Sequence, residues 1–287
     1  MSIGDFHTHS TRSDGRLLPT ELIDLAASRG VRVMALTDHD TLEGLPEATA
    51  AAARHPGFTL IPGVELSCDV PGSEVHMLGL FIDPDDAALN TQLARFRERR
   101  LARAEQMVAA LDGLGVPVEW TRVQEIAGEG SVGRPHVAQA LLERGYVETI
   151  TEAFDRYLGR NSPAYVQREK LTPAEAVTML RAAGGLPVFA HPSFTEDYEQ
   201  VAASLAAEGL FGMEVFYKAY GPELVQSLHE LARAHSLFPL GGSDYHALDR
   251  EDEREPGDIP LPDEVVEAFL AAARDEGCRV PEPAPAG

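Results

Sequence analysis

The chain has 287 residues, of which 44% are hydrophobic and 24% are charged, which is typical of one large folded unit and excludes a disordered chain. Its formal net charge is −22, so non-specific binding to duplex DNA is not expected, because such binding needs a basic surface. The two cysteines exclude a disulfide framework, and neither the opening MSIGDFHTHS nor any long apolar run suggests a signal peptide or a membrane span. We therefore expect a soluble, cytoplasmic protein.

Short apolar runs that alternate with helical patterns follow the opening. Segments 19–30 and 173–185 each begin with proline and end at glycine, which are typical helix boundaries. Such alternation favours a mostly parallel sheet or barrel, although two runs within 63–79 predict an antiparallel hairpin. The expected buried strands are 31–37, 58–66, 75–82, 186–190, 210–216 and 237–244.

The stretch from Pro84 to Thr172 interrupts this alternation, because its pattern is almost entirely helical. We therefore expect an α/β barrel domain formed by residues 1–84 and 172–280, with an α-helical insertion domain at 85–171. The Pro- and Ala-rich residues 281–287 are expected to form a short disordered tail.

Histidines and carboxylates gather at the ends of the expected strands. His7 and His9 stand two residues apart, so both imidazoles point to one face of a strand. Active sites of α/β folds assemble at the carboxyl ends of strands, and imidazole with carboxylate suits zinc, manganese or iron. A single such histidine is more often an ordinary core residue, but chance would not place the whole set at strand ends. The others in the set are Asp14, Asp38, His39, Asp40, Glu65, His76, His191, Asp244 and His246.

These residues resemble the motifs of the PHP family, the polymerase and histidinol phosphatase superfamily. Glu65 and His76 match two ligands that members carry between the second and third motifs. The resemblance implies a distorted seven-stranded (β/α)7 barrel of parallel strands, whose cleft holds two to three divalent ions (Mn, Fe or Zn). The four motifs read DFHTHS at 5–10, TDHD at 37–40, AHP at 190–192 and GSDYH at 242–246.

The resemblance also implies a ligand set for a trinuclear metal centre, in which Glu65 bridges the first two ions. A hydroxide bridging these ions would attack phosphorus, so no side chain is expected to be the nucleophile. Asp5 and Asp40 flank ligand histidines and are expected either to orient imidazole N–H groups or to cap a turn or helix. The three sets are His7, His9, Glu65 and Asp244; Glu65, His76 and His191; and Asp14, His39 and His246.

Three residues of the helical stretch are candidates for binding the substrate phosphate. Arg134 and His136 lie at an expected helix start, where backbone N–H groups attract anions, and His136 has the alternative role of supporting the metal cluster. Arg100 belongs to the basic segment 95–103 but falls on an apolar helical stripe, so it points either to the cleft or to solvent.

The insertion with GRPH at 133–136 looks like the PHP subgroup that acts on nucleotides or short RNA. We therefore expect a metal-dependent phosphoesterase that hydrolyses phosphomonoesters of the AMP or 3′,5′-nucleoside bisphosphate class. The alternatives are a 5′-3′ exoribonuclease on short 5′-phosphorylated RNA, a histidinol-phosphate phosphatase and a non-catalytic metal-binding module. An amidohydrolase is a further alternative, which is disfavoured because neither lysine, Lys170 or Lys218, is placed to bridge metals.

Overall fold

Seven strands form one sheet in sequence order in the computed structural model, which describes residues 1–70, 73–128, 130–167, 171–218, 220–248 and 253–285. The amide of Phe6 donates to the carbonyl of Gly241 at 3.3 Å, so the first and last strands meet and the sheet curls into a nearly closed barrel. The strands are β1 (Gly4–Asp5), β2 (Val33–Leu36), β3 (Thr59–Val70), β4 (Ser73–Leu80), β5 (Leu186–Ala190), β6 (Gly212–Tyr217) and β7 (Phe238–Gly242).

Strand β4 runs antiparallel to both of its neighbours, whereas the other adjacent strands pair in parallel. The hairpin predicted within 63–79 is therefore confirmed, and the implication of seven parallel strands is wrong. The reason is local, because only residues 71–72 separate β3 from β4 and a parallel partner would need a crossover of about a dozen residues. The reversal places the beginning of β4 at the edge where the other strands end, with His76 opposite Ala190.

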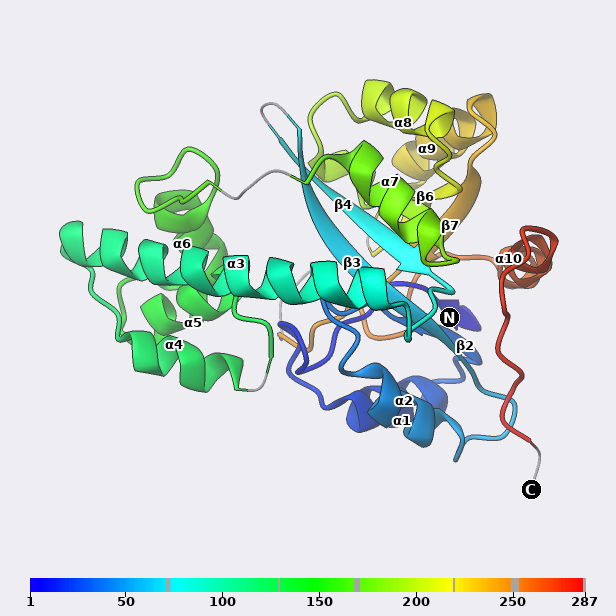
Figure 1. Cartoon of the computed structure of the whole chain (residues 1–287), viewed down its shortest axis with the longest axis horizontal. Helices are drawn as coiled ribbons and strands as arrows, with labels where there is room; N and C mark the ends of the chain where they lie inside the picture. Colours follow the sequence, from blue (N-terminus) through cyan, green and yellow to red (C-terminus); the bar gives the residue numbers. More distant parts are fainter. Residues whose placement is uncertain (71–72, 129, 168–170, 219, 249–252, 286–287) are drawn as a thin grey trace.

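Helices cover the outside of the barrel (Figure 1). Residues of β5 and β6 are buried along their whole length, as expected for strands that are covered on both faces. The predicted helices at 19–30 and 173–185 are confirmed as α1 and α7. The barrel helices are α1 (Pro19–Ser28), α2 (Leu45–Ala52), α7 (Pro173–Ala182), α8 (Tyr198–Ala207), α9 (Pro222–Ala234) and α10 (Asp263–Asp275), with a 3₁₀ turn η2 (Pro192–Phe194).

The remaining helices lie to one side of the barrel (Figure 1) and form a second hydrophobic cluster of their own. The long helix α3 joins the two clusters, since Leu89 and Leu93 belong to the barrel core and Met107 and Leu111 to the second cluster. This supports an α-helical insertion, whose exact limits stay a prediction. Its elements are α3 (Ala87–Gly113), α4 (Trp120–Ala127), α5 (Arg134–Glu143), α6 (Ile150–Ala153) and the π-helical turn η1 (Phe154–Leu158).

The C-terminal segment returns to the barrel beyond α10. Ala284 exchanges backbone hydrogen bonds with Gly57 and Phe58, at 2.8 and 2.9 Å. Residues 286–287 of the predicted tail lie outside the described residues, so its disorder stays a prediction. Among the described residues, no helix is both long and apolar enough to cross a membrane.

Candidate metal centre

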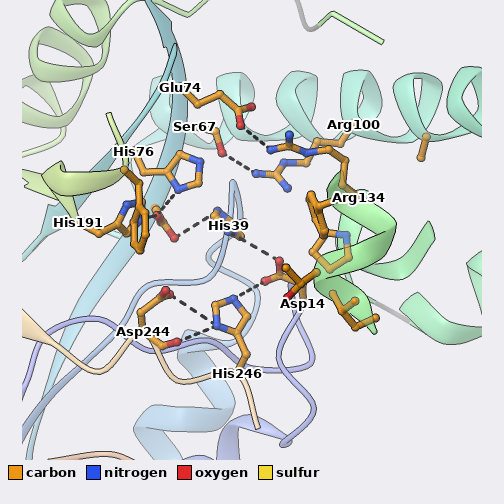
Figure 2. Close-up of a pocket in the computed structure, with 18 of the residues that line it drawn as sticks. Asp14, His39, Ser67, Glu74, His76, Arg100, Arg134, His191, Asp244 and His246 are labelled. Carbon is orange, nitrogen blue, oxygen red and sulfur yellow. Dashed lines mark hydrogen bonds and ion pairs between the residues drawn. The ribbon is translucent and has the colours of Figure 1, made fainter. Parts of the chain in front are cut away.

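The side chains predicted as metal ligands meet at one edge of the barrel, where the strands of the parallel pairs end and β4 begins (Figure 2). His7 and His9 follow β1, His39 follows β2, and His191 follows β5. The fold therefore brings together, from six parts of the sheet, residues that lie as far apart in the sequence as positions 7 and 246.

The first group contains His7, His9, Glu65 and Asp244, whose ligand atoms lie within 4.8 Å of one another. Nε2 of His7 is 3.1 Å from Oε2 of Glu65 and 3.3 Å from Oδ1 of Asp244. Nε2 of His9 is 3.1 and 3.2 Å from the same two oxygens. Two ring nitrogens and two carboxylate oxygens thus face one point, which is a donor set for a divalent transition metal.

Two further groups adjoin the first. His9, Asp14, His39 and His246 form one, and His39, Glu65 and His76 form the other. His39 therefore belongs to two groups, whereas the family resemblance assigned it to one.

Glu65 lies at the middle of the whole centre. Its Oε2 is 3.3 Å from Nδ1 of His39, in addition to the contacts with the first group. Its Oε1 is 2.7 Å from Nδ1 of His76 and 3.3 Å from Nε2 of His191. One carboxylate therefore touches the imidazoles on both sides, which is the arrangement that a bridging ligand requires.

Several atoms of the centre are buried without a hydrogen-bond partner in the described part of the chain. They are Nε2 of His9, Oδ1 of Asp14, Nδ1 of His39 and Nδ1 of His191. A buried polar atom left unsatisfied costs about 1–3 kcal/mol. Coordination of a cation would satisfy the atoms of His9, Asp14 and His39, whereas His191 faces Glu65 through its other ring nitrogen, Nε2. The donor set and the unpaired atoms therefore both fit divalent ions.

Electrostatics keeps the carboxylates of the centre ionised. Burial alone would raise the pKa of Glu65, but the nearby His39, His7 and His76 hold that pKa well below its ordinary value. Burial would likewise raise the pKa of Asp244, and Lys218 together with His7 holds it well below the usual range. Ionised carboxylates at neutral pH are what metal coordination needs.

A buried carboxylate that sequence reasoning missed contacts two of the candidate ligand histidines. Oε1 of Glu214 lies 3.1 Å from Nδ1 of His7, and Oε2 accepts the backbone amide of His191 at 2.6 Å. A carboxylate on the second ring nitrogen fixes the orientation of a metal-binding histidine. The signal was present in the sequence, because Glu214 is an acidic residue inside the apolar run 210–216.

Asp5 and Asp40 have other partners than imidazoles. The two oxygens of Asp5 accept the amides of Ser243 and Gly257, each at 3.0 Å, so Asp5 fixes the loop after β7. Asp40 forms an ion pair with Arg100. Asp5 therefore holds a turn, which was the second of its two predicted roles. Asp40 neither orients an imidazole nor caps a turn through this contact.

A cavity of about 620 Å³ opens onto the centre. One wall belongs to the barrel, and we call it the barrel wall. It includes Tyr217, Lys218 and the candidate ligands Asp14, His39, Glu65, His76, His191, Asp244 and His246. The opposite wall belongs to the helical insertion, and we call it the insertion wall. The insertion wall consists of Arg100, Arg103, Ala104, Met107, Gly133, Arg134, Pro135, Ile150, Thr151 and Phe154.

Two of the three predicted phosphate contacts line this cavity (Figure 2). Arg134 donates to Oε2 of Glu74 at 2.6 Å, and Arg100 donates to Oγ of Ser67 at 2.9 Å as well as to Asp40. The third, His136, is buried and its Nδ1 accepts the amide of Gly133 at 3.0 Å. His136 therefore closes the first turn of α5, and burial lowers its pKa.

Two further residues next to the centre were not predicted as site residues. Nζ of Lys218 lies 3.0 Å from Oδ2 of Asp244, and the hydroxyl of Tyr217 donates to the same oxygen at 2.7 Å. Both line the cavity. The other lysine, Lys170, lies outside the described residues.

The sequence is similar to a known domain family and to characterised proteins. Residues 5–158 match the PHP domain. The chain is 38% identical over 256 residues to a 3′,5′-nucleoside bisphosphate phosphatase of Chromobacterium violaceum, covering 85% of this chain and 87% of that protein. It is 34% identical over 249 residues to the 5′-3′ exoribonuclease Rnm of Salmonella typhimurium, covering 85% of each.

Two solved structures resemble this chain over nearly its whole length. A structure named as an amidohydrolase from Chromobacterium violaceum, with bound sulfate and no metal, superposes with a TM-score of 0.87 at 34% identity, covering 95% of this chain and 97% of that one. A protein named by inference as a metal-dependent phosphoesterase from Bifidobacterium adolescentis superposes with a TM-score of 0.83 at 31% identity, covering 93% and 95%.

Proposed function

Because the chain belongs to the PHP domain family and is a metal-dependent phosphoesterase, we propose that it hydrolyses phosphomonoesters of small nucleotides. The substrate class is a nucleoside monophosphate or a 3′,5′-bisphosphate, as the name of the Chromobacterium violaceum relative suggests. The observation that carries this proposal is one cavity with candidate metal ligands on one wall and with Arg100 and Arg134 on the other.

We propose that two to three divalent ions (Mn, Fe or Zn) are held by the residues predicted from the sequence. Such ions, when bound, lower the pKa of a coordinated water to about 7 and offset the charge of phosphate oxygens. Three ions would bring about +6 against about −3 from Asp14, Glu65 and Asp244. The cleft would then attract an anion although the chain carries a net charge of −22. In support, Glu214 fixes the ring of His7.

The insertion wall is proposed to bind the rest of the nucleotide. Arg100 and Arg134 supply guanidinium groups, which bind phosphate with two parallel hydrogen bonds. Met107, Ile150 and Phe154 give the same wall an apolar surface, suited to a sugar or base. The cavity of about 620 Å³ lies in the usual range for small-molecule sites, roughly 300–1,000 Å³.

A second candidate is 5′-3′ exonuclease activity on short 5′-phosphorylated RNA. It is favoured by the similarity to Rnm of Salmonella typhimurium, which matches nearly the same length of chain as the phosphatase relative. The two activities differ only in the leaving group, so one centre can support both.

The test is phosphate release by purified protein supplied with Mn²⁺. The panel contains AMP, adenosine 3′,5′-bisphosphate, histidinol phosphate and a 5′-phosphorylated RNA trimer with product analysis. Release from the two nucleotides is the expected result. Mononucleotides from the trimer would establish the second candidate, and a preference for histidinol phosphate would overturn both. Ion binding without turnover of any ester would support a non-catalytic module.

We also propose a cytoplasmic location. Cys68, which is buried, and Cys278, which is partly exposed, are not joined in a disulfide. Free thiols are usual in a reducing compartment. Fractionation of cells that express the protein would test this.

A further inference from the structure

We propose that Lys218 binds the phosphoryl group that is cleaved, on the barrel wall, across the centre from Arg100 and Arg134. This inference rests on the proposed function, because it assigns a residue to the phosphoester substrate. It adds a cation at the metal centre itself to the proposed phosphate contacts Arg100 and Arg134.

The position of Lys218 is the first observation. It directly follows β6, as the candidate ligands His191 and Asp244 follow β5 and β7 closely. Its side chain lines the cavity, and the ammonium lies 3.0 Å from Oδ2 of Asp244. The side chain is only 14% exposed, so the ammonium is directed to the centre rather than to bulk solvent.

The two oxygens of Asp244 have different environments. Oδ1 faces the imidazoles, at 3.3 Å from His7 and 3.2 Å from His9. Oδ2 accepts the Tyr217 hydroxyl at 2.7 Å and also faces Lys218. Tyr217 by itself can therefore orient the carboxylate so that Oδ1 serves as the ligand, and this orientation does not need the positive charge that Lys218 adds beside Oδ2.

That charge is the second observation. An ammonium has no lone pair to offer a metal, and beside a metal ligand it weakens the binding of a cation by repulsion. The arrangement becomes favourable when an anion lies next to both the ions and the ammonium. The oxygens of a phosphoryl group supply that anion, and Lys218 has three N–H donors for them.

The backbone is the third observation. Lys218 has a φ of +35°, in the left-handed region that residues other than glycine rarely adopt. Asp40, His191 and Asp244, with φ of +54°, +29° and +50°, share this conformation just beyond β2, β5 and β7. Strained backbone of this kind clusters at functional sites. Lys218 thus shares this backbone conformation with the candidate ligands His191 and Asp244.

The experiment compares Lys218→Met with Tyr217→Phe, which removes a hydrogen bond to the same oxygen without changing charge. Calorimetry measures the binding of Mn²⁺ to each protein, and then of inorganic phosphate to the Mn²⁺-loaded protein. Circular dichroism and thermal melting confirm that each variant is folded. Lys218→Arg keeps the charge and serves as the conservative variant.

We expect Lys218→Met to bind Mn²⁺ as tightly as the unaltered protein or more tightly. Its affinity for phosphate should fall by about 10- to 100-fold, the size of one charged hydrogen bond, and Lys218→Arg should restore part of the loss. Tyr217→Phe should weaken Mn²⁺ binding and leave phosphate affinity at the loaded centre nearly unchanged.

The inference is overturned if Lys218→Met weakens Mn²⁺ binding and leaves phosphate affinity unchanged, because Lys218 would then only position Asp244. It is also overturned if the loaded, unaltered protein binds no phosphate. Phosphate binding that depends on Lys218, in a protein that cleaves no ester of the panel, would support the inference while the proposed nucleotide substrate fails.

Discussion

The two walls of the cavity are built in different ways. On the barrel wall, candidate ligands extend from strand ends whose positions follow from the register of the sheet, as when His76 lies opposite Ala190. On the insertion wall, side chains extend from helices that pack in a separate hydrophobic cluster. Two ion pairs join residues of the insertion wall to the barrel, Arg100 with Asp40 and Arg134 with Glu74. Groups that need fixed mutual distances thus lie on the sheet, whereas proposed substrate contacts lie on an attached unit.

The largest expected effect is on the barrel wall. We expect His7→Ala to lower turnover by at least about 1,000-fold, because loss of metal ligation removes several kcal/mol of transition-state stabilisation. Steady-state kinetics and metal analysis give the readout. His229→Ala is the control, because His229 is exposed on α9, and it should keep full activity. A fully active His7→Ala protein would show that this wall is not the metal centre.

Chelation should have a similar effect on turnover and a measurable effect on stability. Removal of ions by EDTA leaves buried imidazoles and carboxylates without the cations that fit them. Ligand present at 100 times its Kd contributes about 2.7 kcal/mol of stability, so the melting temperature should fall by several degrees. Calorimetry with and without EDTA measures this, and added Mn²⁺ should reverse it. Equal melting temperatures would contradict the predicted centre.

A smaller effect is expected on the insertion wall. Arg134→Ala should lower kcat/KM by about 10- to 100-fold, mainly through KM, since one charged contact to phosphate is lost. The matched control is Arg122→Ala, whose ion pair with Glu143 is at the surface. Mn²⁺ affinity should be unchanged in both variants. A large fall in Mn²⁺ affinity for Arg134→Ala would mean that the two walls are not separate in function.

The smallest expected effect on turnover comes from substitutions in the two hydrophobic cores. Leu141→Ala in the insertion cluster and Leu78→Ala in the barrel core should each destabilise the surrounding core by about 2–5 kcal/mol. Leu141→Ala should raise KM slightly and keep Mn²⁺ affinity, whereas Leu78→Ala should weaken Mn²⁺ binding. Denaturant titration and calorimetry on both variants test this. Equal losses of Mn²⁺ affinity in the two variants would indicate that the barrel and the insertion form a single cooperative unit.

The barrel strands and most of the candidate site could be predicted from local patterns in the sequence. The runs 186–190 and 237–244 predicted β5 and β7 closely, because buried strands are continuous apolar segments. Most of the candidate ligands could be proposed because they lie at or just after the end of such a run, whereas Asp14 lies in a turn and His76 in the second strand of the hairpin. The stripe that contains Arg100 left its direction open between the cleft and solvent, and the structure places Arg100 at the cavity, with Leu93 and Met107 of the same stripe buried.

The rest depended on contacts between distant parts of the chain. Glu214 and Lys218 function through partners such as His7 and Asp244, and a local pattern does not show which strand will be the neighbour. Asp40 was considered beside His39 because they are adjacent in sequence, but its partner Arg100 lies 60 positions away. His136 closes its own helix, a local contact that is easily mistaken for a phosphate contact.

Helix α3 has a consequence for engineering. It has 27 residues and is anchored at its start by Asp86, whose side chain accepts the amide of Leu89 at 2.6 Å. Its first half completes the barrel core and its second half completes the insertion core. A chimaera that exchanges the insertion for that of a relative would therefore have to be spliced inside this helix, between Leu93 and Ala104. A splice in the loop before α3 would remove Leu89 and Leu93 from the barrel core together with the insertion.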